Sequence, residues 1–203
     1  MAVSADPTGP RSGIAQRLWE ASRAEFSVRG YHGARVQAIA KGASCNVAIL
    51  YRHWRSKKAL YLDVLRAIRL EVGRHIVASL EKGSPSPAAV VGAYLDAMMR
   101  DPIGARILVR EIIDGGPFLA QLDETEPSLM EPARLAAAAM TAPQAGGRLR
   151  PGVDPMVSVL TVAALAALAA SGHESSRPYL DSALTPDDWR RHLYELLLHG
   201  LVA

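Results

Sequence analysis

The chain has 203 residues, of which 49% are apolar, and it contains a single cysteine. This length allows a full hydrophobic core, while one cysteine excludes an internal disulfide framework and is typical of the cytoplasm, where we expect the protein. Charge is unevenly distributed, because residues 11–58 hold ten Lys and Arg against two acids, and residues 59–203 hold thirteen against seventeen. We therefore expect a basic module attached to a mildly acidic body.

Residues 35–60 predict two short helices joined by a tight turn, followed by the start of a third helix. Apolar residues from Val36 onwards recur at the spacing of one helical face, and the turn falls at residues 44–46. Asn46 can cap the next helix, which extends from Val47 to Trp54. Such a pair of helices is the form in which a helix-turn-helix protein places one helix in a DNA groove.

Basic residues begin the third helix of this segment. Ser56 can cap that helix, and Lys57 and Lys58 are its first residues. Positive charge at a helix N-terminus opposes the helix dipole by ~0.3–1 kcal/mol per charge, and a nearby phosphate would reverse the sign. The placement therefore favours contact with a nucleic acid.

The rest of the chain is predicted to be helical, without strand alternation. A stripe from Leu60 to Leu80 at four-residue spacing predicts one long helix. Prolines and glycines divide the remainder, so we expect helices at about residues 88–100, 102–114, 154–171 and 185–200, and a loop over residues 143–151. Residues 118–140 are less regular, because Pro127 and Pro132 interrupt them. The apolar run 156–170 is shorter than the roughly twenty residues that span a membrane, so we expect a buried helix and no membrane partner.

Together these residues resemble the TetR-type (tetracycline-repressor, AcrR-like) family of bacterial transcriptional regulators. The resemblance holds in register over the first quarter of the chain, and the remainder matches only in its helical layout. The matching positions are Leu18, Trp19, Glu20, Ala21, Phe26, Gly30, Tyr31, Ile39, Ala40, Ala43, Leu50, Tyr51, His53, Trp54, Ser56, Lys57 and Leu60.

The resemblance implies an all-α fold of about nine helices in three parts. These are a flexible arm at residues 1–12, a three-helix helix-turn-helix DNA-binding domain at residues 13–58, and a helical effector-binding and dimerisation domain at residues 59–203. The implied function is that of a ligand-responsive, sequence-specific transcriptional regulator. It would be a homodimeric repressor, released from a pseudo-palindromic operator in double-stranded DNA by a small molecule.

The residues implied to contact DNA lie on the two short helices and at the start of the third. Residues 47–53 would form the recognition helix in the major groove, where an Arg bonds a guanine edge and a Gln an adenine. The nearest to bases are Gln37, Val47, Ala48 and Arg52, and the implied phosphate contacts are Arg35, Tyr51, His53 and Lys57. For each side chain a structural or merely solvated role is the alternative.

Five positions depart from the family pattern near the DNA, namely Arg35, Ser44, Ile49, Ala48 in place of a frequent Gly, and Lys58 in place of a frequent Glu. Arg35 replaces a Thr that caps the second helix and contacts phosphate, and Arg reaches a phosphate but caps poorly. Ser44 replaces a turn Gly, which is tolerable if the turn does not need a strongly positive φ. Ile49 replaces a frequent Thr, so the inherited phosphate contacts at positions 35 and 49 are open.

The body is implied to hold the effector site and the dimer interface, with ordinary core as the alternative at each position. Methionines with few aromatic residues suit an adaptable apolar pocket. The candidate effector residues are Tyr94, Met98, Ile103, Ile107, Arg110, Phe118 and Met140. In the family the last two helices pair with those of a second subunit, and the candidate dimer residues are Val159, Ala163, Ala167, Trp189, Leu193 and Leu196.

Catalysis has weak support in the sequence. Cys45 lies in the predicted turn without an activating arrangement, and His192 and His199 are seven apart rather than the three or four of a helical metal chelate. We therefore expect no enzyme, no cofactor and no metal. Two other classes remain open, a small helical enzyme or ligand carrier, and a helical interaction protein whose basic charge is only solvated surface.

Overall fold

The computed structural model describes residues 13–142, 149–176, 178 and 184–201, and the expected arm at residues 1–12 lies outside this range. The described residues form ten α-helices and one 3-10 helix without a β-sheet, which confirms the all-α prediction with one helix more than expected. In chain order they are α1 Gly13–Gly33, α2 Val36–Gly42, α3 Val47–His53, α4 Lys57–Lys82, α5 Pro87–Arg100, α6 Pro102–Ile113, α7 Pro117–Thr125, the 3-10 helix Pro127–Met130, α8 Glu131–Met140, α9 Pro155–Ser176 and α10 Pro186–Leu201.

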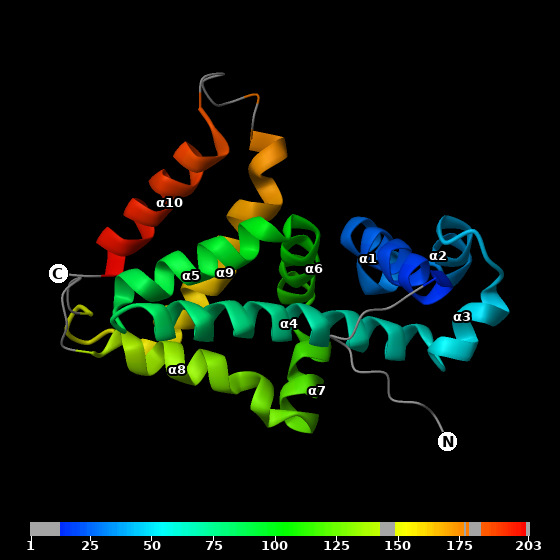
Figure 1. The fold of residues 1–203 in the computed structure, drawn as a ribbon, viewed down its shortest axis with the longest axis horizontal. Coiled ribbons are helices and arrows are strands. Elements are labelled where there is room, and N and C mark those ends of the chain that lie inside the picture. Colours follow the sequence, from blue (N-terminus) through cyan, green and yellow to red (C-terminus); the bar gives the residue numbers. More distant parts are fainter. Residues whose placement is uncertain (1–12, 143–148, 177, 179–183, 202–203) are drawn as a thin grey trace.

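Helix α4 is the axis of the molecule. It begins beside α3 and runs into the body, so that α1–α3 lie at one end of it (Figure 1). The stripe predicted from Leu60 to Leu80 faces inward, and Leu60, Val64 and Ile68 are buried. One continuous apolar core therefore extends from the small N-terminal module into the body.

Local hydrogen bonds set the boundaries of the helix-turn-helix. Asn46 Oδ1 and Ser56 Oγ each accept a hydrogen bond at 3.0 Å from the backbone N–H three residues later, which confirms both predicted caps. Arg35 begins α2 without a side-chain cap, as expected of Arg. Its backbone N–H donates to Glu25 Oε1 at 3.2 Å instead. A cap contributes typically ~1 kcal/mol, so sequence close to each end fixes where these helices start.

The turn between α2 and α3 is strained. Ser44 has a φ of 53°, in the left-handed region that favours glycine. The turn is closed by hydrogen bonds from Ser44 N to Lys41 O at 3.0 Å and from Cys45 N to Ala40 O at 2.9 Å. A side chain in this conformation costs roughly 1 kcal/mol. We expected Ser to be tolerated if the turn did not need a strongly positive φ, and this condition is not met.

Helix α1 is broken at Gly30, where φ is 65° and ψ is −177°, a conformation essentially confined to glycine. A break leaves carbonyl groups of the preceding turn without helical partners. Arg110 of α6 donates to two of them, from Nε to Ser27 O at 2.8 Å and from Nη2 to Val28 O at 2.7 Å. The break therefore fastens the N-terminal module to the body.

Helices α4 and α8 cross in close contact at one glycine. A Cβ atom on Gly73 of α4 would lie 2.7 Å from Cγ of Pro132 in α8, which is too close for any side chain. Gly73 is buried within α4, and α8 in turn packs on α9. This crossing fixes where α4 rests on the body.

Helix α9 is apolar all round, and packing decides which side faces inward. Val159 and Ala167 were predicted at the dimer interface, but they are 0% and 1% exposed in a helix that packs on α5, α6 and α8. They are unavailable to a second subunit, so the prediction is wrong for both. By length and composition, residues 155–172 could also cross a membrane, although the contacts of α9 are those of a core helix. The large outward-facing residues of α9 are Val157, Leu160, Leu165 and Leu168.

Candidate nucleic-acid interface

Helix α3 turns one side to the core and the other to solvent. Leu50 is fully buried and Val47 is half-buried. Tyr51 has 46% of its surface exposed, which is too much for a side chain that closes the core of the module. On α2 and at its start, Gln37 and Arg35 are exposed as well. The remaining exposed residues of α3 are Ala48, Arg52 and His53.

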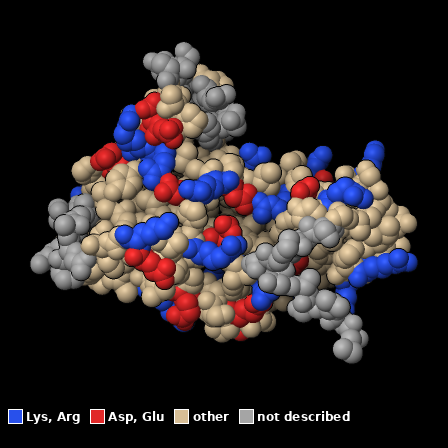
Figure 2. Space-filling view, viewed as in Figure 1, with Lys and Arg blue, Asp and Glu red and all other residues tan. Residues whose placement is uncertain are grey.

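The surface around α2 and α3 is basic. Lys and Arg side chains project from the end of the molecule that these helices form (Figure 2). The exposed cations are Arg29, Arg35, Lys41, Arg52, Arg55 and Lys58. None of their side chains forms an ion pair with another described residue, unlike those of Arg23 and Arg66. Positive side chains without acidic partners attract phosphate groups.

Trp54 joins the end of α3 to α4. Its indole Nε1 donates to Asp63 Oδ2 at 2.9 Å, and the residue is half-buried. This position is that of a packed side chain rather than of one that stacks on nucleic acid. Any displacement of α4 therefore carries the end of α3 with it.

Lys57, predicted to contact phosphate, is directed into the protein. Its Nζ donates to Tyr31 O at 2.8 Å and to Ala34 O at 3.1 Å. The same atom lies 4.6 Å from the centroid of the Tyr31 ring. The start of α4 is thus attached to the end of α1.

Glu111 of α6 is a buried carboxylate, with 1% of its surface exposed. Its Oε2 accepts from the Tyr61 hydroxyl at 3.0 Å, and its Oε1 accepts from the backbone N–H groups of Phe118 at 2.7 Å and Leu119 at 3.2 Å. Burial, with the negative charge of Glu111 added, raises the pKa of Tyr61 well above its ordinary value, so the hydroxyl remains a donor. Glu111 therefore joins α4, α6 and the start of α7.

Four aromatic rings surround this carboxylate and connect α1, α4 and α7. Ring centroids of the contacting pairs are 4.4–5.2 Å apart, the range of favourable aromatic contacts. Phe118, a candidate effector residue, belongs to this cluster with Phe26, Tyr31 and Tyr61. The spacings of three and four residues among the charged side chains along α6 would also suit a surface ion-pair ladder or groups that orient a ligand. The spacing of Glu111 to the nearest charged residues, Arg110 and Asp114, gives no sign of its burial.

The candidate effector residues do not line one common cavity among the described residues. Tyr94, Met98 and Ile107 are buried in the core, and burial raises the pKa of Tyr94 to about 12. Ile103 is largely exposed, and Arg110 binds the carbonyl groups of α1.

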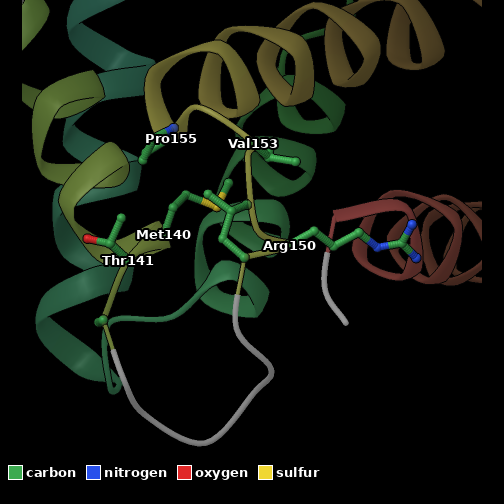
Figure 3. A pocket seen from close by; sticks show the side chains of 7 residues that line it. Met140, Thr141, Arg150, Val153 and Pro155 are labelled. Carbon is green, nitrogen blue, oxygen red and sulfur yellow. The ribbon is translucent and has the colours of Figure 1, made fainter.

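Met140 does border a cavity, at the end of α8 and the start of α9. The cavity has a volume of about 470 Å³. Arg150 extends away from it towards α10, where its Nη2 donates to His199 O at 2.9 Å (Figure 3). The residues that line the cavity are Met140, Thr141, Ala142, Leu149, Arg150, Val153 and Pro155.

Helix α10 is held on α5 and leaves apolar residues exposed. Arg190 forms an ion pair with Asp96, and Gly92 leaves room for the Tyr194 ring. Leu196, a predicted dimer residue, has 73% of its surface exposed. Three other predicted dimer residues are half-buried, namely Ala163 on α9 and Trp189 and Leu193 on α10. In the described part of the chain, no three His, Cys, Asp or Glu residues are grouped as metal ligands.

The fold and this surface define a helix-turn-helix protein. Residues 18–64 match the family described as bacterial regulatory proteins, tetR family. The HTH-type transcriptional repressor DhaR of Mycobacterium sp. (strain GP1) is 30% identical over 99 residues, which are 49% of this chain and 50% of DhaR. The match therefore spans about half the length of that relative.

Solved structures extend the similarity over the whole chain. SCO4942 of Streptomyces coelicolor, assigned as a transcriptional regulator, is 25% identical with a TM-score of 0.58, covering 93% of this chain and 98% of that one. The ketosteroid transcriptional regulator KstR2 of Mycobacterium tuberculosis has the same fold, with 16% identity, a TM-score of 0.67, and coverage of 96% and 98%. The match to the tetR family of bacterial regulatory proteins thus covers residues 18–64, and the similarity to solved regulators covers the fold of nearly the whole chain.

Proposed function

We propose that this protein is a homodimeric, ligand-responsive, sequence-specific DNA-binding transcriptional regulator that represses from a pseudo-palindromic operator. The observation that carries the proposal is the placement of α3. Leu50 anchors the helix in the core, while Tyr51, Arg52 and His53 are exposed on a basic surface. A helix held in this way fits the major groove, which is about 12 Å wide.

Base recognition and phosphate contact fall to different residues of this surface. Arg52 has the donor pair that a guanine edge accepts, and Gln37 has the donor and acceptor that match adenine. Val47 and Ala48 offer small apolar surfaces suited to a thymine methyl group. Contacts to phosphate fix the register of the helix without reading sequence. They are assigned to Arg35, Tyr51 and His53.

A second copy of the chain would cover the outer face of α9 and α10. Leu168 of α9 and Leu196 of α10 are 54% and 73% exposed, a costly position for large apolar side chains in an unpaired protomer. Ala163, Trp189 and Leu193 border the same face. Two-fold pairing would place two α3 helices roughly 34 Å apart, one turn of DNA, which a palindromic site matches.

The effector is assigned to the cavity beside Met140. Its volume of about 470 Å³ lies in the range of small-molecule sites, ~300–1,000 Å³. A lining that mixes apolar side chains with Thr141 and Arg150 suits an amphipathic molecule that carries a polar or acidic group. Because Arg150 also bonds α10, an occupant would act on a helix of the proposed dimer face. Its effect is limited to its differential affinity for the two conformations.

Selection of duplex DNA from a random pool, followed by gel shift, tests the DNA-binding proposal. Tyr51→Ala and Arg52→Ala are expected to weaken binding by about tenfold or more, because each removes a direct contact. Arg134→Ala is the matched control, an exposed arginine on α8 that pairs only with Glu131. Failure of the wild type to enrich any sequence, or equal affinity of all four proteins, would refute the proposal.

Thermal-shift screening of small amphipathic molecules tests the effector assignment. A molecule that raises Tm should also release the selected DNA. Val153→Trp, which fills the cavity from its exposed rim, should abolish both effects without changing DNA affinity. A ligand that still acts on this variant binds elsewhere.

A further inference from the structure

The end of α1 is held by two cations that come from different helices, α6 and α4. Arg110 of α6 bonds two carbonyls before the break at Gly30, and Lys57 of α4 bonds two carbonyls after it, those of Tyr31 and Ala34. Arg110 connects α1 to the body, whereas Lys57 connects it to the helix that follows the recognition helix. The orientation of α3 relative to α1 therefore depends on Lys57.

Most of the hydrogen-bonding capacity of the Lys57 ammonium group is used within the protein. It has three N–H donors, and two are used on carbonyl oxygens at 2.8 and 3.1 Å, with the Tyr31 ring 4.6 Å away. These interactions direct the half-buried side chain towards α1, so a phosphate at the surface would have to compete with them. The carbonyls at the end of α1 supply the negative partner that a cation at the start of α4 needs.

Arg55 differs from Lys57 in each of these respects. It directly follows α3 and Trp54, it is exposed, and its side chain has no hydrogen bond or ion pair with a described residue. Lys58 is exposed too, but its Nζ lies 5.9 Å from the Phe118 ring, on the side of α7. Of the three cations, Arg55 is the one available beside α3.

We propose that Lys57 is a positioning residue that sets the recognition helix against α1, and that Arg55 makes the phosphate contact at this end of α3. The proposal rests on the DNA-binding function proposed above. It predicts two distinct signatures in the dependence of DNA affinity on salt, because each lost phosphate contact lowers the slope of log K against log [salt] by about 0.9.

The test uses the full chain and the duplex that the wild type selects from a random pool. Dissociation constants are measured between low and moderate salt, at a temperature where thermal unfolding shows each variant to be folded. Lys57→Met keeps the side-chain stem over Tyr31 and removes the donors, and Arg55→Met removes the exposed guanidinium. Lys58→Met controls for the loss of one charge at the start of α4. If Lys57→Met does not fold, Lys57→Gln, which retains a neutral N–H donor, replaces it.

Lys57→Met is expected to lower Tm and to weaken binding about tenfold at every salt concentration, with an unchanged slope. Arg55→Met is expected to leave Tm unchanged and to reduce the slope by about 1.8 relative to Lys58→Met, because the dimer loses two phosphate contacts. A slope reduced by Lys57→Met, an affinity untouched by it, or a slope unaffected by Arg55→Met overturns the proposal. A wild type that binds no DNA refutes the proposed function instead, so the two failures are distinguishable.

Discussion

Removal of the Tyr61 hydroxyl is expected to destabilise the protein, because Glu111 then remains buried with one partner fewer. The hydroxyl donates to Oε2 over 3.0 Å, and both residues are 1% exposed. A hydrogen bond to a charged group contributes about 1.5–3 kcal/mol. In a chain of this size 1 kcal/mol shifts Tm by about 2–4 °C, so Tyr61→Phe should lower Tm by about 3–12 °C.

Thermal and urea unfolding followed by circular dichroism measure this loss. Tyr94→Phe is the matched control, because Tyr94 is also buried and its hydroxyl has no hydrogen bond to a described residue. The control should change the free energy of unfolding by less than about 0.5 kcal/mol. Equal effects of the two substitutions would refute the role assigned to Glu111.

The dependence of stability on pH provides an independent test of the same interaction. Tyr61 is held protonated in the folded protein, with a pKa above the value of 10.0 expected for the unfolded chain. Its stabilisation is therefore complete below about pH 10 and is lost as pH rises further, by up to about 1.36 kcal/mol per unit. Tyr94, with a pKa of about 12, acts in the same direction from pH 10 upwards. Tyr61→Phe should lose stability less steeply above pH 10 than the wild type.

Three further substitutions are expected to act in known directions. Ser44→Gly should raise the free energy of unfolding by about 0.5–1 kcal/mol in urea titrations, because φ at this turn is 53°; a loss of stability would contradict the strain. Gly30→Ala should lower it by about 1–3 kcal/mol, since only glycine adopts φ 65° with ψ −177° easily; an unchanged midpoint would show that α1 can straighten. Leu168→Glu should shift sedimentation equilibrium towards monomer, and an unchanged mass would place the dimer interface elsewhere.

Features set by neighbours in sequence could be predicted, and features set by distant partners could not. Asn46 and Ser56 were identified as caps because a cap needs only the N–H three residues later, and the buried stripe of α4 follows from its spacing. The inward side of α9 was not predictable. When a helix is apolar on all sides, its sequence does not show which side will be buried. Packing against α5, α6 and α8 decides this, which is why Val159 and Ala167 were wrongly predicted at the dimer interface.

The charged residues of α6 show the same limit for the candidate site. Their spacing fits a surface ladder, yet Arg110 bonds the end of α1 and Glu111 lies in the core. Both outcomes depend on groups 50 or more residues away, such as Tyr61 and Ser27. Lys57 likewise matches the family motif, while its direction depends on the carbonyls at the end of α1.

The close contact between Gly73 and Pro132 is a point about which α4 can tilt relative to the body. From Lys57 to Gly73 the helix rises about 24 Å, at 1.5 Å per residue. A tilt of about 8° about this point would displace the start of α4, and with it the end of α3, by about 3.3 Å. That distance is close to the 3.4 Å between successive base pairs. Under the proposed function, a rotation of this size would be enough to move the recognition helix out of step with its half-site.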